Sequence, residues 1–208
     1  MSAPTTPDDA WQRLAEGNTR FLIGQPLHPR QDVETRERLA SSQAPVATFF
    51  GCSDSRVGAE ILFDQGLGDL FVVRNAGHVV SDAAVASIEY AVAVLGTPIV
   101  VVLAHDRCGA VRAAVDAEAP DAPALPPLIA AHVDHIRPAV EASRRAHPEG
   151  PLDADAVAGV HLEATVAALL AASELLSAAV ADGSLAVIGA QYRLAEGRVE
   201  RRVAVGLA

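Results

Sequence analysis

The sequence contains no lysine, so all 16 of its basic residues are arginine. This absence excludes mechanisms that need a lysine, such as Schiff-base chemistry or phosphate capture by a lysine of a nucleotide-binding loop. Acidic residues are more numerous, at 26, and give a formal net charge of −10. Such a surface repels phosphates, so nucleic acid is not expected as a partner.

Long hydrophobic runs and aromatic residues are also scarce. Aromatics make up only 4% of the chain. No apolar run reaches the roughly 18 residues of a membrane span without an interrupting charge, glycine or proline. The first eleven residues have neither the basic flank nor the apolar stretch of a secretory signal. We therefore expect a soluble, cytoplasmic protein with no membrane partner.

Cysteine is the next scarce residue, with only Cys52 and Cys108 in the chain. A disulfide between them is not expected in a reducing compartment. There, a pair of cysteines more often serves a metal or a catalytic site.

What the sequence does have is 208 residues, half of them hydrophobic, which is enough for one domain with a real core. Almost wholly apolar runs alternate with helical stretches, a pattern typical of parallel strands covered by helices. The expected strands are 44–52, 69–77 and 97–105, and the helices that follow them are 58–66, 81–95 and a stretch from Gly109. The prediction is an α/β fold with a mostly parallel central sheet flanked by helices.

The two ends of the chain complete this prediction. Helical spacing over 8–24 and 33–42 indicates N-terminal arm helices, so residues 1–42 form a helical arm and 43–208 the α/β core of a single domain. After a loop at 117–127, helical stretches cover 125–147 and 152–182, and the second is long enough to suggest packing on another subunit. Segments 185–194 and 198–207 read as a C-terminal antiparallel strand pair around a glycine-containing turn.

Two of the apolar strands end in potential metal ligands. Cys52 closes one strand, and His105 closes another, with Cys108 three residues further on. Sites in open α/β sheets gather beyond the carboxyl ends of the strands, so these three side chains are expected to converge. Two thiolates and an imidazole are a donor set that zinc favours, and a catalytic zinc typically has three protein ligands and one open position.

A carboxylate and a guanidinium stand next to the first of these ligands, at Asp54 and Arg56. The arginine can hold the carboxylate in a bidentate ion pair and keep it ionised. Such a carboxylate can accept a hydrogen bond from metal-bound water. This matters because two thiolates neutralise the zinc charge and weaken its effect on that water.

Together these motifs carry a resemblance to a known family. Cys52-x-Asp54-x-Arg56, followed by His105-x-x-Cys108-Gly109, resembles the signature of the β-class carbonic anhydrases. The blocks 71–77 (FVVRNAG) and 88–91 (IEYA) are also similar to blocks of that family. The resemblance extends from about Trp11 to the C-terminus.

The resemblance implies zinc-dependent, reversible hydration of CO2 to bicarbonate and a proton. It assigns Cys52, His105 and Cys108 as zinc ligands, with zinc hydroxide attacking CO2 while the Asp54–Arg56 pair orients the hydroxide. Asp54 is also implied as a fourth zinc ligand in a closed state, because one subgroup of the family switches itself off in this way at low pH.

The family likeness further implies a substrate pocket and an oligomer. Gln43 matches a glutamine that hydrogen-bonds substrate near the zinc, Phe71 and Tyr90 match pocket aromatics, and Gly109 belongs to the same pocket. In the family part of this pocket comes from a neighbouring subunit, which implies a homodimer or homotetramer.

The self-inhibiting subgroup also binds bicarbonate at a second site built from a Trp, an Arg and a Tyr. Arg74 and Tyr192 match the last two, but Phe49 stands at the tryptophan position. The bicarbonate switch is therefore not expected here, although closure by Asp54 alone stays open.

Other interpretations of the same residues remain open at this stage. Asp54 suits a helix N-cap, and the two cysteines suit buried apolar positions. The same scaffold and metal can hydrolyse carbon disulfide or carbonyl sulfide, and a permanently closed zinc module is the non-enzymatic alternative. A cysteine phosphatase loop is excluded because it needs five residues between cysteine and arginine, whereas three separate Cys52 from Arg56. His78 is a weak candidate for a proton shuttle.

Overall fold

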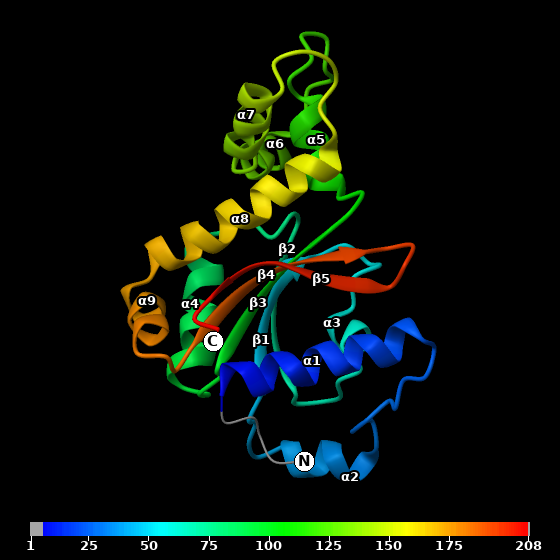
Figure 1. Ribbon diagram of the computed structural model, residues 1–208, viewed down its shortest axis with the longest axis vertical. Helices are drawn as coiled ribbons and strands as arrows, with labels where there is room; N and C mark the ends of the chain where they lie inside the picture. The colour runs from blue at the N-terminus through cyan, green and yellow to red at the C-terminus, as the bar shows by residue number, and fades with distance from the viewer. Residues whose placement is uncertain (1–5, 208) are drawn as a thin grey trace.

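A computed structural model describes residues 6–207 of the chain. Its centre is a five-stranded sheet in the order β2-β1-β3-β4-β5 (Figure 1). The strands are β1 (Ala47–Cys52), β2 (Leu70–Asn75), β3 (Ile99–His105), β4 (Ala186–Arg193) and β5 (Arg198–Val205). The first four run parallel, and β5 pairs antiparallel with β4 at one edge. The predicted fold class, including the C-terminal strand pair, is confirmed.

Strands β1, β3 and most of β4 are buried along their whole length, which explains their nearly continuous apolar sequences. Alternate residues point to opposite faces of the sheet. Phe49, Val101 and Ile188 face one side, where they pack with Leu14 and Leu62. The facing helices there are α1 (Pro7–Leu22) and α3 (Ala59–Leu62).

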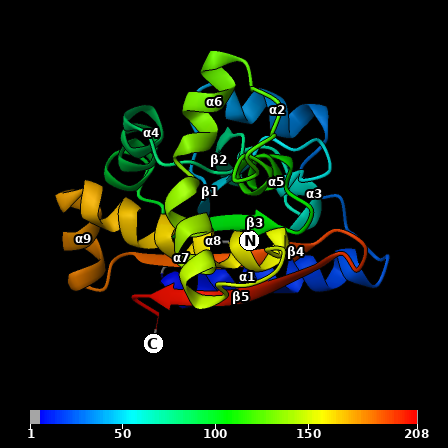
Figure 2. The same cartoon turned by 90° about the horizontal axis from the view of Figure 1, so that it is seen from above.

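The opposite face is covered by three other helices. They are α4 (Asp82–Ala93), α8 (Ala154–Ala172) and α9 (Glu174–Ala181). Their apolar side chains pack with Phe50 and Val102 of the sheet. Figures 1 and 2 both show α4 and α9 on one side of the molecule and α3 on the other.

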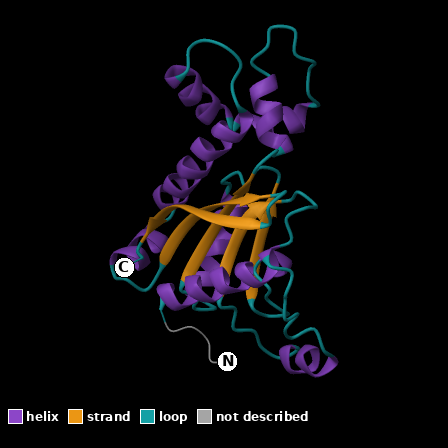
Figure 3. Cartoon of the chain, turned by 45° about the vertical axis from the view of Figure 1, so that its right-hand side comes forward, coloured by secondary structure: helices purple, strands orange, loops and turns teal. Residues whose placement is uncertain are grey.

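A third cluster lies beyond the carboxyl ends of the parallel strands. It is formed by α5 (Gly109–Asp116), α6 (Pro127–Asp134), α7 (Arg137–Ala146) and the first turns of α8. Figure 3 shows this helical lobe apart from the sheet layers. Cys52 and Cys108 are buried members of the cluster, so the lobe closes over the candidate ligands.

The prediction of one long helix over 152–182 is wrong. The chain forms α8 and α9 instead, separated at Ser173, whose backbone is extended and whose hydroxyl accepts a hydrogen bond from Leu176 N–H. The Ser173 hydroxyl also donates to Glu89 at 2.6 Å, which fixes the break against α4. One face of the segment is covered within the chain, because Leu162, Val166 and Leu169 bury against the sheet.

The stretch 125–147 is likewise two helices. α6 ends at Asp134, and α7 begins at Arg137 with Pro138 in its first turn. Proline lacks a backbone N–H and is tolerated only in the first turn of a helix, so a continuous helix cannot pass through this position.

The predicted N-terminal arm contains two helices with different surroundings. α1 is part of the domain, since its Ala10 and Leu14 are fully buried in the core. α2 (Val33–Leu39) has only Thr35 buried, and Figure 1 shows it away from the sheet. Residues 1–5, where the arm was predicted to begin, lie outside the described part of the chain, as does residue 208.

α8 is long and apolar enough, by length and composition, to cross a bilayer. However, 44% of its most apolar window is buried inside the molecule, against the sheet and the helical lobe. α8 is therefore explained as a core helix of this domain.

Candidate active site

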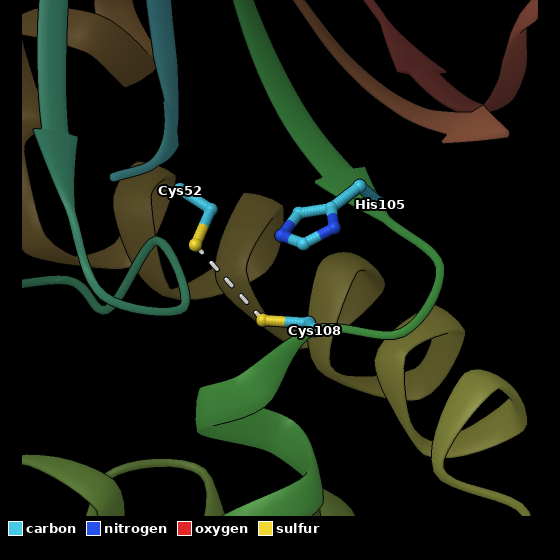
Figure 4. A group of neighbouring side chains, drawn as sticks. All are labelled: Cys52, His105 and Cys108. Atoms are coloured by element: carbon cyan, nitrogen blue, oxygen red, sulfur yellow. Dashed lines mark hydrogen bonds between the residues drawn. The ribbon is translucent and has the colours of Figure 1, made fainter. Parts of the chain in front are cut away.

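Cys52, His105 and Cys108 lie together at the carboxyl end of the sheet. Cys52 is the last residue of β1, and His105 is the last residue of the neighbouring parallel strand β3. Cys108 is the N-cap residue of α5. One ligand atom from each lies within 4.8 Å of the others, and all three residues are buried (Figure 4). The convergence follows from parallel pairing, which brings the ends of adjacent strands to the same edge.

The donor atoms suit a tetrahedral zinc ion. The two sulfurs are 4.0 Å apart. Two sulfurs bound to one tetrahedral zinc at about 2.3 Å would lie about 3.8 Å apart. His105 Nδ1 lies 2.8 Å from the carbonyl oxygen of Asp106, to which it donates, while its Nε2 is buried and has no hydrogen-bond partner. A buried nitrogen without a hydrogen-bond partner, next to two sulfurs, is the arrangement expected of three metal ligands.

The pKa values of the two thiols are shifted in opposite directions. The hydrogen bond from Cys108 lowers the pKa of Cys52 most strongly, and His105 and the Gly77 N–H lower it further. The same bond raises the pKa of Cys108, which holds the shared proton. Burial disfavours a charged His105, but the neighbouring Cys52 sulfur outweighs burial, so the pKa of His105 is raised. The cluster thus already favours one thiolate, and a cation would favour the second.

Asp54 lies beside this cluster and is held by Arg56. The arginine Nε donates to Oδ1 at 2.9 Å and Nη2 donates to Oδ2 at 2.7 Å. The backbone N–H of Arg56 also donates to Oδ1 at 2.9 Å. The guanidinium beside it holds the pKa of Asp54 well below its usual range. Oδ2 is 3.9 Å from His105 Nε2, so the carboxylate is ionised, pinned and close to the ligand atoms.

The backbone of the ligand loops is held by two further side chains, Arg74 and Asp155, whose role here is not predicted from the sequence. Arg74 donates to the carbonyl oxygens of Cys52 at 2.9 Å and of Asp54 at 2.8 Å. Asp155, in the first turn of α8, accepts from the Arg107 N–H at 2.7 Å. The available signal was weak, since an arginine in a strand and an aspartate at a helix start have many ordinary roles.

The predicted pocket residues are placed less simply. Gln43 is exposed and precedes the start of β1, at the end of the sheet opposite to Cys52. Phe71 pairs with Thr48 in register, four residues before the level of Cys52, a separation of about 13 Å along a strand. Tyr90 lies beside it, with ring centroids 6.1 Å apart. Within one chain, therefore, these three residues do not reach the metal cluster.

Gly109 is closer to the centre, as the first residue of α5 directly after Cys108. A Cβ placed there would meet nothing within 4 Å. The missing side chain leaves open space next to a ligand.

The residues matched to a bicarbonate site do not form a free binding group in this chain. Phe49 and Tyr192 are both buried in one core cluster, and Arg74 is engaged by the two loop carbonyls. His78 is also fully buried, and burial lowers its pKa well below the usual value. These surroundings do not support His78 as a proton shuttle to solvent.

Comparison with known proteins agrees with this geometry. Residues 47–199 match the family model described as carbonic anhydrase. The chain belongs to this family, in its β class. This β-carbonic anhydrase has curated relatives that match nearly its whole length. It is 48% identical over 202 residues to carbonic anhydrase 2 of Mycobacterium tuberculosis, covering 97% of this chain and 96% of the relative. It is 46% identical over 206 residues to the carbonic anhydrase of Mycolicibacterium smegmatis, with the same coverage.

Solved β-carbonic anhydrases share the fold. The Coccomyxa enzyme in complex with acetazolamide matches with a TM-score of 0.70 and 27% identity, covering 99% of this chain and 89% of that one. A chain from the work on two tetrameric enzymes of Sordaria macrospora matches with a TM-score of 0.74 and 24% identity, covering 92% and 96%. β-Carbonic anhydrases are zinc enzymes, which fits the Cys52, His105 and Cys108 group.

Proposed function

We propose that this carbonic anhydrase catalyses the reversible hydration of CO2 with a zinc ion held by Cys52, His105 and Cys108. The observation that carries the proposal is the convergence of these three buried donors beside a carboxylate pinned by an arginine. When bound, zinc supplies a Lewis acid that makes water a nucleophile near neutral pH. The remaining roles belong to the side chains around it.

Asp54 is proposed to orient the attacking water. As an ionised carboxylate it can only accept hydrogen bonds, so the proton of the water points to Asp54 and a lone pair points to the substrate. Arg56 keeps the carboxylate in this state through its two side-chain bonds. Because Arg56 binds both oxygens and leaves one lone pair of Oδ2 for the water, we propose that the site is open in this conformation and that Asp54 is not a permanent fourth ligand. This favours an enzyme over a closed structural zinc module.

Substrate contacts are proposed to come from two subunits. Gln43, Phe71 and Tyr90 lie away from the metal cluster of their own chain, and Tyr90 is 47% exposed. The strand β2, which carries Phe71, is also an open edge of the sheet. We propose that the protein forms a homodimer or homotetramer in which these residues complete a partner's site. The tetrameric β-carbonic anhydrases of Sordaria macrospora support this assembly.

A cytoplasmic location is proposed on the same chemistry. Both cysteines are free thiols in the structure and are needed as metal ligands. A reducing compartment preserves them in that form.

The decisive experiment is stopped-flow CO2 hydration by zinc-loaded protein between about pH 6.5 and 9, the range that brackets ionisation of a zinc-bound water. Activity near neutral pH is expected and supports the open site. Activity only at alkaline pH would overturn the proposed open state but keep the enzyme. Zinc-loaded protein without activity at any pH would overturn the function and direct the search to carbon disulfide or carbonyl sulfide.

A further inference from the structure

The loop that follows β2 reaches the metal cluster with a backbone group. Gly77 N–H donates to the Cys52 sulfur at 3.3 Å. The loop around it is closed by Asn75, whose side chain accepts from Val79 N–H and donates to Val79 O, both at 2.7 Å. Gly77 itself has a φ of +76°, and a Cβ would come within 3.0 Å of Ala110 and Ile136. The geometry therefore brings a peptide group to the sulfur where a side chain would not fit.

A histidine from the helical lobe binds the other end of that same peptide group. His132 of α6 has its Nε2 at 2.6 Å from the carbonyl oxygen of Ala76. A carbonyl only accepts, so the histidine nitrogen must carry the proton and donate it. The Ala76 carbonyl and the Gly77 N–H belong to one planar amide. Hydrogen bonds in such a chain strengthen one another, so the His132 bond polarises the N–H that points to Cys52.

A second histidine binds the next carbonyl. His161 of α8 is 6% exposed, and its Nε2 lies 2.8 Å from the carbonyl oxygen of Gly77. Its ring also packs on that of His78, with centroids 4.7 Å apart. His132 and His161 come from two helices, and they fix two successive peptide groups of one short loop. Neither histidine touches a proposed metal ligand; only the Gly77 N–H does, through its bond to the Cys52 sulfur.

We propose that His132 and His161 are positioning residues for the Gly77 N–H: His132 polarises this N–H through the shared amide, and His161, by holding the next peptide group, helps to aim it at the Cys52 sulfur. The inference rests on the proposed zinc function. A hydrogen bond to a thiolate withdraws charge from the sulfur, so the thiolate donates less charge to a metal. In a site with two thiolates, this bond opposes the neutralisation that weakens a zinc ion as a Lewis acid.

The test compares His132→Ala and His161→Ala with His135→Ala as a matched control. His135 follows α6 three residues after His132 but is exposed. Each variant is loaded with Co2+, and the thiolate-to-metal charge-transfer absorption is recorded. Zinc affinity is measured by competition with a chromophoric chelator. Circular dichroism establishes that each variant is folded.

The expected result is a shift of the charge-transfer band to longer wavelength in both test variants, because a thiolate without this hydrogen bond donates more charge to the metal. Zinc affinity should nevertheless fall by about 10-fold or more, the size typical of lost partners of metal ligands, because the loop no longer positions Cys52. His135→Ala should match the wild type. His132→Gln keeps an N–H donor and should restore part of the loss. Because His132 is only partly buried, its variants are expected to fold even where His161→Ala does not.

An unchanged band and unchanged affinity in a folded His132→Ala protein would overturn the inference. So would an equal loss in His135→Ala, because the effect would then be general. The failure of the proposed function looks different: the wild type itself would bind no zinc or would not hydrate CO2.

Discussion

The Arg56 guanidinium binds the Asp54 carboxylate with two hydrogen bonds: Nε donates to Oδ1 at 2.9 Å and Nη2 donates to Oδ2 at 2.7 Å. Only one residue separates the two in sequence, so their pairing needs no help from distant parts of the chain. What the fold adds is position, since Asp54 Oδ2 lies 3.9 Å from His105 Nε2. The pair therefore brings a fixed acceptor to the metal cluster.

Asp54→Asn should keep zinc but lose activity. The amide can donate where the carboxylate only accepts, so a nucleophilic water is no longer held in one orientation. We expect kcat/KM to fall by about 10- to 100-fold. Stopped-flow CO2 hydration measures the loss, and elemental analysis checks the zinc content. Near-normal turnover with full zinc would remove Asp54 from the mechanism.

Replacing a proposed zinc ligand should remove the metal. We expect His105→Ala and Cys108→Ser each to lose stoichiometric zinc after dialysis against a weak chelator, because a two-ligand site holds zinc poorly. His147→Ala is the control, since His147 is an exposed residue after α7. Elemental analysis gives the ratio of zinc to protein. One equivalent of zinc retained in both ligand variants would contradict the site.

Arg74→Met should reduce activity without changing the zinc ligands. Arg74 anchors the carbonyls of Cys52 and Asp54, and its loss frees the loop that carries both residues. We expect kcat to fall by about 10-fold, in the range found for supporting residues of metal sites. Arg202→Met, at an exposed position of β5, should leave kcat unchanged. Equal rates for the two variants would show that Arg74 is not needed.

Asp64 should make stability depend on pH. Its carboxylate is buried, and it accepts from Arg20 at 2.6 Å and from the backbone N–H groups of Leu27 and His28. Burial opposes the negative charge, but these donors outweigh burial, so the pKa of Asp64 is lowered. A lowered folded-state pKa stabilises the protein above the unfolded value of about 3.9, and the stabilisation is lost as pH falls through the folded value.

Asp64→Asn should therefore cost about 2 kcal/mol of unfolding free energy at pH 7. The difference from wild type should shrink as pH falls below about 4. Urea unfolding followed by circular dichroism measures both. Asp134→Asn, in an exposed pair with Arg137, should change stability by less than about 1 kcal/mol. A difference for Asp64→Asn that is independent of pH would contradict the assignment.

The sequence by itself determined the fold class and the candidate ligands. Continuous apolar runs such as 97–105 have one stable environment, a sheet covered on both faces, so parallel strands could be predicted from local pattern alone. Cys52 and His105 end two such runs, and the parallel pairing of these strands brings both residues to the same edge of the sheet. The Asp54–Arg56 motif is local in the same sense.

Only the tertiary structure decided what depends on distant partners. Ser173 breaks the 152–182 stretch because Glu89 on another helix accepts its hydroxyl, and no local pattern in an alanine-rich segment records that contact. The links from His132 and His161 to the loop at Gly77 join residues 56 and 84 positions apart. Helical propensity and hydrophobic period act within a few residues, whereas these bonds exist only after the lobe has folded over the sheet.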